Sequence, residues 1–351
     1  MDFTFSVQQR AQHEKLRRAL MPLATPELLR ELATGEVGVA HSLSVSLSEL
    51  GVFDLSVPVA NEGQGGADLD WALVAQELGY HALPSWLAET AWLGVACLNA
   101  LPPTPLQAHW LPRIAKGRAR LALVQPGRPA VVQARGADLY LLFHANEWHA
   151  VEASAVVLQP LSGSRALNEA YGVEWTPSSQ TCVARGDPAQ AMMRACVNRG
   201  ALSVALTQLG LAMRMLDLAI DHSVQRKQFG RPVGSFQAIK HALADVAVQI
   251  EFAKPLAYLA AYALAHAEDL GAQALDFCIS HARLAAGEAL QGAARQAQQV
   301  HGAVGYCWDF DLHVYLTRGW ATETDWGARA FHQARVNEAV LGESAMLDAY
   351  C

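Results

Sequence analysis

The chain has 351 residues, of which 52% are hydrophobic and 17% charged, and its formal net charge of -7 gives a pI near 6.0. This length is sufficient for two or three packed domains. Because no basic stripe is present, nucleic acid is not an expected partner. The six cysteines form no CxxC pair, which argues against a disulfide framework or a zinc site and favours a reducing cytoplasm. No signal peptide and no membrane span are predicted, since every long apolar stretch is interrupted by charges.

Residues 1–118 are predicted to be helical. Residues 71–78 combine good helix formers with apolar residues at helical spacing. Glycines crowd the segment 61–67, which is typical of a turn between helices. The prolines Pro102, Pro103 and Pro105 interrupt the next helix. We therefore expect an N-terminal helical domain over 1–118.

Residues 119–188 have a different character. Short apolar runs at 121–124, 139–143 and 156–158 are bounded by Gly, Pro, Asn and Ser. Runs of this length with such boundaries favour β-strands. The segment is therefore expected to be a small β domain between two helical ones.

Residues 189–351 are predicted to be helical again. Apolar residues recur at spacings of three and four over 202–220 and 239–250, with a Gly- and Pro-containing interruption at 230–234. Such stripes are typical of a helical bundle. The order of helices, strands and helices indicates an α+β fold, mostly α, with segregated domains at 1–118, 119–188 and 189–351.

Two motifs lie in the C-terminal bundle. The first is RKQFG at 226–230, followed by Pro232 and by FQ at 236–237; the second is QVHGAVGY at 299–306. Together they resemble the RxxFG…FQ and QxxGGxG signatures of the acyl-CoA dehydrogenase family. Further blocks in the same order are also similar to that family, at 49–53, 65–66, 77–79 and 110–117. The resemblance spans about residues 45–345.

The resemblance implies an N-terminal helical domain, a small β domain and a C-terminal four-helix bundle. It implies FAD, the α,β-dehydrogenation of an acyl-CoA, and dimers in which two chains grip each flavin. An arginine suits the FAD diphosphate because it offers several charge-assisted donors. By this resemblance the residues that contact FAD are Arg226, Gln228, Phe229, Gln237, Gln299, Gly302 and Ala303.

The residues that such an enzyme needs for chemistry are missing. The family carries its catalytic Glu either nine residues after an Arg or 26 residues before the Arg of RxxFG. Counting from Arg318 gives Gly327, and counting back from Arg226 gives Gly200; glycine cannot act as a base.

The segment that holds the flavin ring in the family, TEPxxGSD, matches 124–129 here, where Val124 replaces the hydroxyl residue and Gln125 the acid. The second ring clamp has no match, since the neighbours of Trp148, the nearest Trp, do not fit. The β region is also shorter than is usual in the family.

The chain thus keeps what it would give to a neighbour's flavin and lacks what its own site would need. This asymmetry predicts a non-catalytic subunit that shares FAD with a homologous catalytic partner. Residues 306–318 resemble the GxTWExDxHLYLRR segment of bacterial acyl-CoA dehydrogenases that degrade sterol and bile-acid side chains, often as α2β2 tetramers; Cys307 and Thr317 depart from it. By that resemblance the substrate is a steroid side-chain CoA, bound through the partner, and the electron acceptor an electron-transferring flavoprotein.

Two alternatives remain open. The chain could be a self-sufficient enzyme whose displaced base is Glu323 or Asp325, or a flavin-free scaffold that reuses the fold. The histidines are too widely spaced to predict a metal site. Trp308, Trp320 and Trp326 are expected to serve in packing rather than in a substrate cage.

Overall fold

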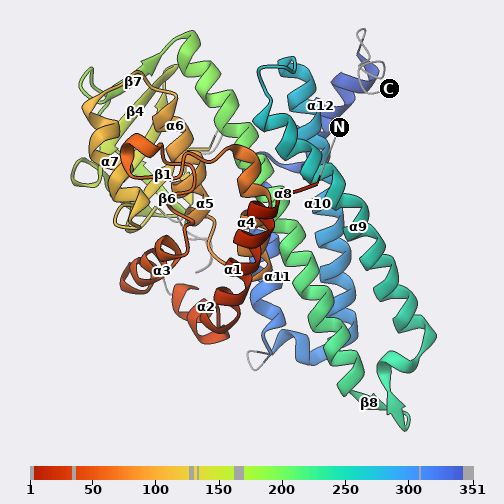
Figure 1. Ribbon diagram of the computed structural model, residues 1–351. Helices are drawn as coiled ribbons and strands as arrows, with labels where there is room; N and C mark the ends of the chain where they lie inside the picture. Colours follow the sequence, from red (N-terminus) through yellow and green to blue (C-terminus); the bar gives the residue numbers. More distant parts are fainter. Residues whose placement is uncertain are drawn as a thin grey trace. The chain divides into compact units, whose positions relative to one another are not determined.

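A computed structural model describes residues 4–33, 37–125, 130–132, 134–161, 170–307 and 310–342 (Figure 1). The chain forms two compact units. The bundle unit comprises Met1–Pro26, Ala72–Leu83 and Ala201–Cys351, and the sheet unit comprises Glu27–Trp71 and Pro84–Gly200. The predicted fold class, mostly α with a small β region, is confirmed. The domain boundaries at 118/119 and 188/189 divide the sequence differently and stay a prediction.

The bundle unit is built from long helices. They are α1 (Val7–Leu23), most of α4 (Trp71–Tyr80), the later part of α8 (Asp187–Gln225), α9 (Gln237–Ala265), α10 (Ala272–His301), α11 (Leu312–Ala321) and α12 (Arg329–Leu341). The short strands β8 (Lys227–Gln228) and β9 (Arg231–Pro232) join α8 to α9 through the 3-10 turn η6 (Val233–Ser235). The turns η7 (Gly302–Tyr306) and η8 (Thr322–Thr324) follow α10 and α11.

Small residues set the packing of this unit. The facing sides of α9 and α10 are rich in buried alanine, which allows the two helices to run close together along their length. Where α4 meets α8, a Cβ at Gly210 would overlap the backbone of Gln76, and a Cβ at Gly79 would overlap that of Thr207. Glycine is therefore required at both positions of this helix contact.

Helix α8 has a window that is long and apolar enough to cross a membrane, but 61% of that window is buried within the protein. This burial is what a core helix shows. The predicted apolar stripes 202–220 and 239–250 lie within α8 and α9, so both helix predictions are confirmed. The predicted helix 71–78 corresponds to α4.

The sheet unit combines short helices with two sheets. The helices are α2 (Pro26–Ala33), α3 (Val37–Glu49), α5 (Trp86–Ala88), α6 (Val95–Asn99), α7 (Pro105–Ala115), the 3-10 turns η1 (Val59–Asn61), η2 (Asp68–Asp70) and η4 (Ala153–Ala155), and the π-helix η3 (Glu89–Gly94). One sheet has the order β1-β3-β4-β7, with β1 parallel to β3, and the other β2-β6-β5. Residues of both sheets, among them Tyr140, Val151 and Tyr171, share one hydrophobic cluster.

Three of the strands in this unit were expected. The predictions at 121–124, 139–143 and 156–158 are confirmed as β1 (Leu121–Leu123), β3 (Leu139–His144) and β5 (Val157–Pro160). The structure adds β2 (Ala130–Val132), β4 (Glu147–Glu152), β6 (Ala170–Glu174) and β7 (Cys182–Arg185). The cysteines in the described part of the chain are free thiols.

A buried carboxylate fastens α1 to α4 within the bundle unit. Glu77 is 4% exposed, and its two carboxylate oxygens lie 2.7 Å from His13 Nε2 and 3.2 Å from His81 Nε2. Burial alone would raise the pKa of Glu77, but the hydrogen bond with His13 and the close contact with His81 together outweigh burial and lower the pKa of Glu77 to about 2. The ionised form of Glu77 is therefore favoured by folding.

We expect Glu77→Gln to lower the free energy of unfolding by about 2 kcal/mol at pH 7. Because the folded-state pKa lies below the ordinary 4.5, the contribution of Glu77 is complete above pH 4.5 and is lost as the pH falls from 4.5 toward about 2. Urea unfolding of the wild type and the variant at pH 7 and pH 3 measures both effects. The exposed Glu14→Gln on α1 is the control and should change little; equal losses for the two variants would contradict the assignment.

Candidate functional site

The first base position, Gly327, lies in the turn between η8 and α12. Its φ is +113° and that of Trp326 is +53°, so the backbone here is of a kind that favours glycine. A Cβ at Gly327 would lie 2.7 Å from His332 Nε2 and 2.7 Å from Phe331 Cδ1. His332 is fully buried and its Nδ1 lies 3.1 Å from Ser280 Oγ. The space that a catalytic side chain would need is therefore occupied.

The second base position, Gly200, is buried in the first part of α8, within the sheet unit. The preceding residue, Arg199, fastens this part of the helix: its Nε and Nη2 each donate to the carboxylate of Asp68 at 2.9 Å. Asp68 also accepts a bond of 2.6 Å from Trp92 Nε1 in the π-helix. A buried helix turn held in this way carries no group at Gly200 that could take a proton.

The two substitute acids are engaged with other groups. Glu323 is exposed, and its Oε1 accepts a hydrogen bond of 3.1 Å from Gln291 Nε2. Asp325 is 3% exposed. Both carboxylates act electrostatically on the buried guanidinium of Arg283. The structure thus gives each acid a structural neighbour, and a displaced base at either acid stays a prediction.

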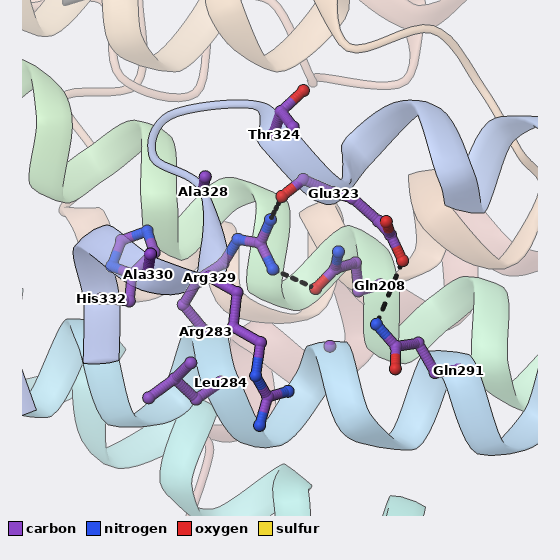
Figure 2. Close-up of a pocket in the computed structure, with 11 residues that line it drawn as sticks. Gln208, Arg283, Leu284, Gln291, Glu323, Thr324, Ala328, Arg329, Ala330 and His332 are labelled. Carbon is purple, nitrogen blue, oxygen red and sulfur yellow. Dashed lines mark hydrogen bonds between the residues drawn. The ribbon is translucent and has the colours of Figure 1, made fainter. Parts of the chain in front are cut away.

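Next to this turn lies a cavity of about 300 Å³ in the bundle unit (Figure 2). It is lined by Gln208 of α8, by Arg283, Leu284, Gly287 and Gln291 of α10, and by Glu323, Thr324, Ala328, Arg329, Ala330 and His332. Of these residues only Glu323 was expected from the sequence to have a functional role. A signal for two others was present: Gln208 and Arg283 interrupt otherwise apolar or small-residue helix faces, and both are buried.

The predicted FAD contacts of the first motif lie on an exposed hairpin after α8. Arg226 directly follows the helix, and its carbonyl accepts a bond of 2.8 Å from Val233 N, which closes the hairpin. Phe229 and Gly230 form the turn between β8 and β9, both with positive φ. Phe229 is 85% exposed. Gln228 and Gln237 are exposed as well.

The contacts of the second motif lie at the same end of the bundle unit. Gln299, Gly302 and Ala303 are exposed at the end of α10 and the start of η7. The rings of His222 in α8 and His301 in α10 stack with centroids 4.3 Å apart and planes 24° apart. His222 is four residues from Arg226, and His301 is two from Gln299. This ring pair therefore brings the two motifs together.

The base position and the predicted FAD contacts lie at different levels of α10. The loop at Gly327 packs near Ser280 and Arg283 through His332, whereas the second motif begins after His301. Eighteen residues of helix separate Arg283 from His301, which corresponds to roughly 27 Å. Figure 1 likewise shows α12 and β8 at opposite ends of the bundle unit. The structure gathers the seven residues predicted to contact FAD at one end of the bundle unit, away from the turn at Gly327.

The structure describes only some of the residues that replace the family's flavin-ring clamp. Val124 is half-buried and Gln125 buried, while residues 126–129 lie outside the described part of the chain. Trp148 in β4 is fully buried, donates its Nε1 hydrogen to the carbonyl of Ala189 at 3.0 Å and packs edge-on against Phe143. Trp148 is thus a core residue that could not lie against a flavin ring without leaving the core.

The remaining expectations concern metals and tryptophans. Among the described residues, no group of three or more His, Cys, Asp or Glu could hold a metal ion. Trp326 is 2% exposed, as expected of a packing residue, whereas Trp320 is 52% exposed. Trp308 and its neighbour Asp309, part of the segment 306–318, lie outside the described residues.

Comparison with known proteins shows the family to which the chain belongs. The family model described as "Acyl-CoA dehydrogenase, N-terminal domain" matches residues 9–118, and "Acyl-CoA dehydrogenase, C-terminal domain" matches 189–348. Acyl-CoA dehydrogenase IpdE2 of Mycobacterium tuberculosis is 32% identical over 309 residues, covering 84% of this chain and 85% of that protein.

Two similar solved structures show the fold alone, because both are below 25% identity. The first is the ChsE4-ChsE5 complex from Mycobacterium tuberculosis, with a TM-score of 0.83, 23% identity and coverage of 98% of this chain and 100% of that chain. The second is the Tcur3481-Tcur3483 steroid ACAD variant, with a TM-score of 0.81, 21% identity and coverage of 96% of this chain and 99% of that chain. The chain belongs to the acyl-CoA dehydrogenase family, flavoprotein oxidoreductases that act on CH-CH groups.

Proposed function

We propose that this chain is a subunit of an FAD-dependent acyl-CoA dehydrogenase that lacks a base of its own and contributes FAD contacts to a homologous catalytic partner. The observation that carries the proposal is the packing around Gly327: His332 and Phe331 occupy the space that the side chain of the family's glutamate would need. The base and the acyl pocket would then come from the partner, most simply in an α2β2 assembly.

The exposed end of the bundle unit supports the sharing of FAD. Members of the family bind FAD, which accepts the hydride when bound. Arg226, the glutamines Gln228 and Gln237, and the exposed ring of Phe229 offer a diphosphate and an aromatic ring suitable partners. Phe229 keeps a bulky side chain in a left-handed turn and in solvent, an arrangement that is unfavourable for folding alone.

The distance between the predicted FAD contacts and the loop at Gly327 also supports the sharing of FAD with a partner. These contacts lie roughly 27 Å along α10 from the loop at Gly327. A group held at the end of the bundle unit is therefore remote from this chain's own base position, and a partner's site is the natural place for it. The ChsE4-ChsE5 complex, whose fold is similar to that of this chain, supports such an assembly.

The proposed substrate class rests on one sequence segment and on one similar solved structure. The resemblance of residues 306–318 and the steroid acyl-CoA dehydrogenase among the similar structures both favour a steroid side-chain acyl-CoA, bound through the partner. An electron-transferring flavoprotein would then reoxidise the complex.

We expect the chain purified alone to be colourless and inactive, and to acquire bound flavin and turnover when co-expressed with its partner. Visible absorbance, size in solution and acyl-CoA oxidation measure these properties. A yellow preparation that oxidises acyl-CoA alone would overturn the proposal and favour a displaced base. In that case Glu323→Gln and Asp325→Asn, made separately, would show which acid takes the proton, since only that variant would lose turnover.

A further inference from the structure

Two histidines lie side by side between the two motifs that are predicted to contact FAD. His222 belongs to α8 and His301 to α10, and their rings stack with centroids 4.3 Å apart. Phe310, just before α11, packs edge-on against His222 with centroids 6.3 Å apart. Both histidines are half-buried. His222 and His301, called the histidine pair below, therefore form one group of titratable rings at this end of the bundle unit.

The histidine pair adjoins Arg226. The backbone N–H of Arg226 donates to the carbonyl of His222 at 2.8 Å, so one helical turn separates the two residues. Side chains four residues apart on a helical turn are neighbours, and the positive charge of Arg226 acts on His222. An anion that pairs with Arg226 would therefore bring its negative charge close to the histidine pair.

Hydrogen bonding fixes where His301 can accept a proton. Its Nδ1 lies 2.8 Å from the carbonyl oxygen of Ala297. A carbonyl only accepts, so Nδ1 carries the hydrogen and Nε2 is the basic nitrogen of the neutral ring. A Cβ at Gly302, the next residue, would meet nothing within 4 Å. The chain is thus open to a ligand directly beside the pair.

The surroundings keep the histidine pair neutral when no anion is bound. Burial lowers the pKa of both histidines. The positive charges of His301 and Arg226 lower the pKa of His222 further, whereas the hydrogen bond to Ala297 acts to raise the pKa of His301. Titratable neighbours along the chain include Asp221, Tyr306 and Asp311. None of these three is among the charges that act on either ring.

A diphosphate bound at Arg226 would reverse this balance. Its negative charges attract a proton, so the pKa of the pair is higher with the diphosphate bound than without it. A ligand that raises a pKa takes up protons on binding, and it binds more tightly as the pH falls through the pKa of the bound form. The gain is complete below the pKa of the free form, which for His222 lies below the ordinary 6.5. Measurements at pH 8 and pH 6 therefore report the change.

We propose that the histidine pair is a proton-accepting part of the shared FAD site, and that it takes up a proton when the FAD diphosphate binds at Arg226. The inference rests on the proposed function, because it concerns the site that this chain shares with its partner. The protonated pair supplies a second positive charge beside Arg226. The stack also holds the end of α8 against the end of α10, so that both motifs can serve one cofactor.

The test is calorimetric titration of the flavin-free complex with FAD at pH 8 and pH 6. We expect the wild-type complex to bind FAD about threefold to tenfold more tightly at pH 6 than at pH 8. The double variant with His222→Phe and His301→Phe keeps two stacking rings without titrating groups, so its affinity should be the same at the two pH values. His281→Phe removes another half-buried histidine, in the first half of α10, and should keep the wild-type pH dependence.

A second measurement needs no variant and stays decisive if the double variant fails to fold. At pH 6.5 the heat of FAD binding to the wild-type complex should differ between buffers of low and high ionisation enthalpy, by the amount that uptake of roughly half a proton or more per FAD requires. Equal heats in the two buffers, or a double variant with the wild-type pH dependence, would overturn the inference.

The outcome for Arg226→Ala separates this inference from the proposed function. If Arg226→Ala weakens FAD binding but no proton is taken up, the role of the histidine pair is wrong and the shared site stands. If Arg226→Ala leaves the complex with its full flavin content, the shared site and the role of the histidine pair are both wrong.

Discussion

Placing the family's glutamate at the first base position, as Gly327→Glu, should destabilise the protein by about 3 kcal/mol and yield no acyl-CoA turnover in the isolated chain. The cost has two sources. The backbone at Gly327 has a φ of +113°, which L-residues rarely adopt, and the new Cβ would overlap His332, which is fully buried. Phe331 is partly exposed and could move, but His332 could not do so without disturbing its contact with Ser280.

Two companion variants separate the causes. Gly327→Ala introduces the same Cβ without a carboxylate, so it should show most of the same loss in urea unfolding. Gly38→Glu is the matched control, because Gly38 is exposed in α3 and a Cβ there meets nothing within 4 Å; its stability should be unchanged or slightly higher. Turnover by the isolated Gly327→Glu chain would refute the view that the missing ring clamp matters.

In the complex with its partner, Arg226→Ala should weaken FAD binding by about tenfold to a hundredfold, because it removes charge-assisted hydrogen bonds to the diphosphate. Arg226 is exposed beyond the end of α8, and its side chain is not needed to close the hairpin, which uses its carbonyl. The thermal stability of this chain should therefore stay close to that of the wild type.

The measurement is the visible absorbance that the complex retains after gel filtration, together with a titration of the flavin-free complex with FAD. Arg18→Ala removes an exposed positive charge from α1, far from either motif in the sequence, and serves as the control. A mutant complex that keeps its full flavin content would show that Arg226 does not reach the cofactor, and the shared-site proposal would lose its main residue.

The fold was predictable where apolar residues were continuous or regularly spaced. Leu139–His144 is an apolar run and was expected as a strand, whereas its hairpin partner β4, Glu147–Glu152, begins and ends with glutamate and was not. The turn between them uses Ala145 and Asn146 with φ of +47° and +63°. A left-handed alanine carries no turn signal in the sequence, so the pairing that recruits β4 became visible only in three dimensions.

In the candidate site, too, positions fixed by sequence spacing were predictable, whereas contacts between distant residues were not. Gly327 and Gly200 could be located by counting from Arg318 and Arg226, because the resemblance fixes the spacing. The requirement for glycine at position 327 could not be predicted from sequence spacing, because it depends on how His332 packs against the turn. The burial of Arg283 was equally hidden, because it depends on carbonyls 39 and 40 residues away in the chain.

Neither compact unit is a continuous piece of chain, since the backbone passes between them after Pro26, Trp71, Leu83 and Gly200. During synthesis, α1 and α4 emerge long before α9, α10 and α12, which complete the bundle unit around them. The contacts of Glu77 with His13 and His81 can form early, but the glycine contact between α4 and α8 must wait for α8, so the first 200 residues leave the ribosome with apolar helix faces uncovered. A gene cut at residue 188 would separate α1 and α4 from the helices that complete the core of the bundle unit. A chaperone or the partner subunit would therefore protect exposed apolar surface most before the last third of the chain is made.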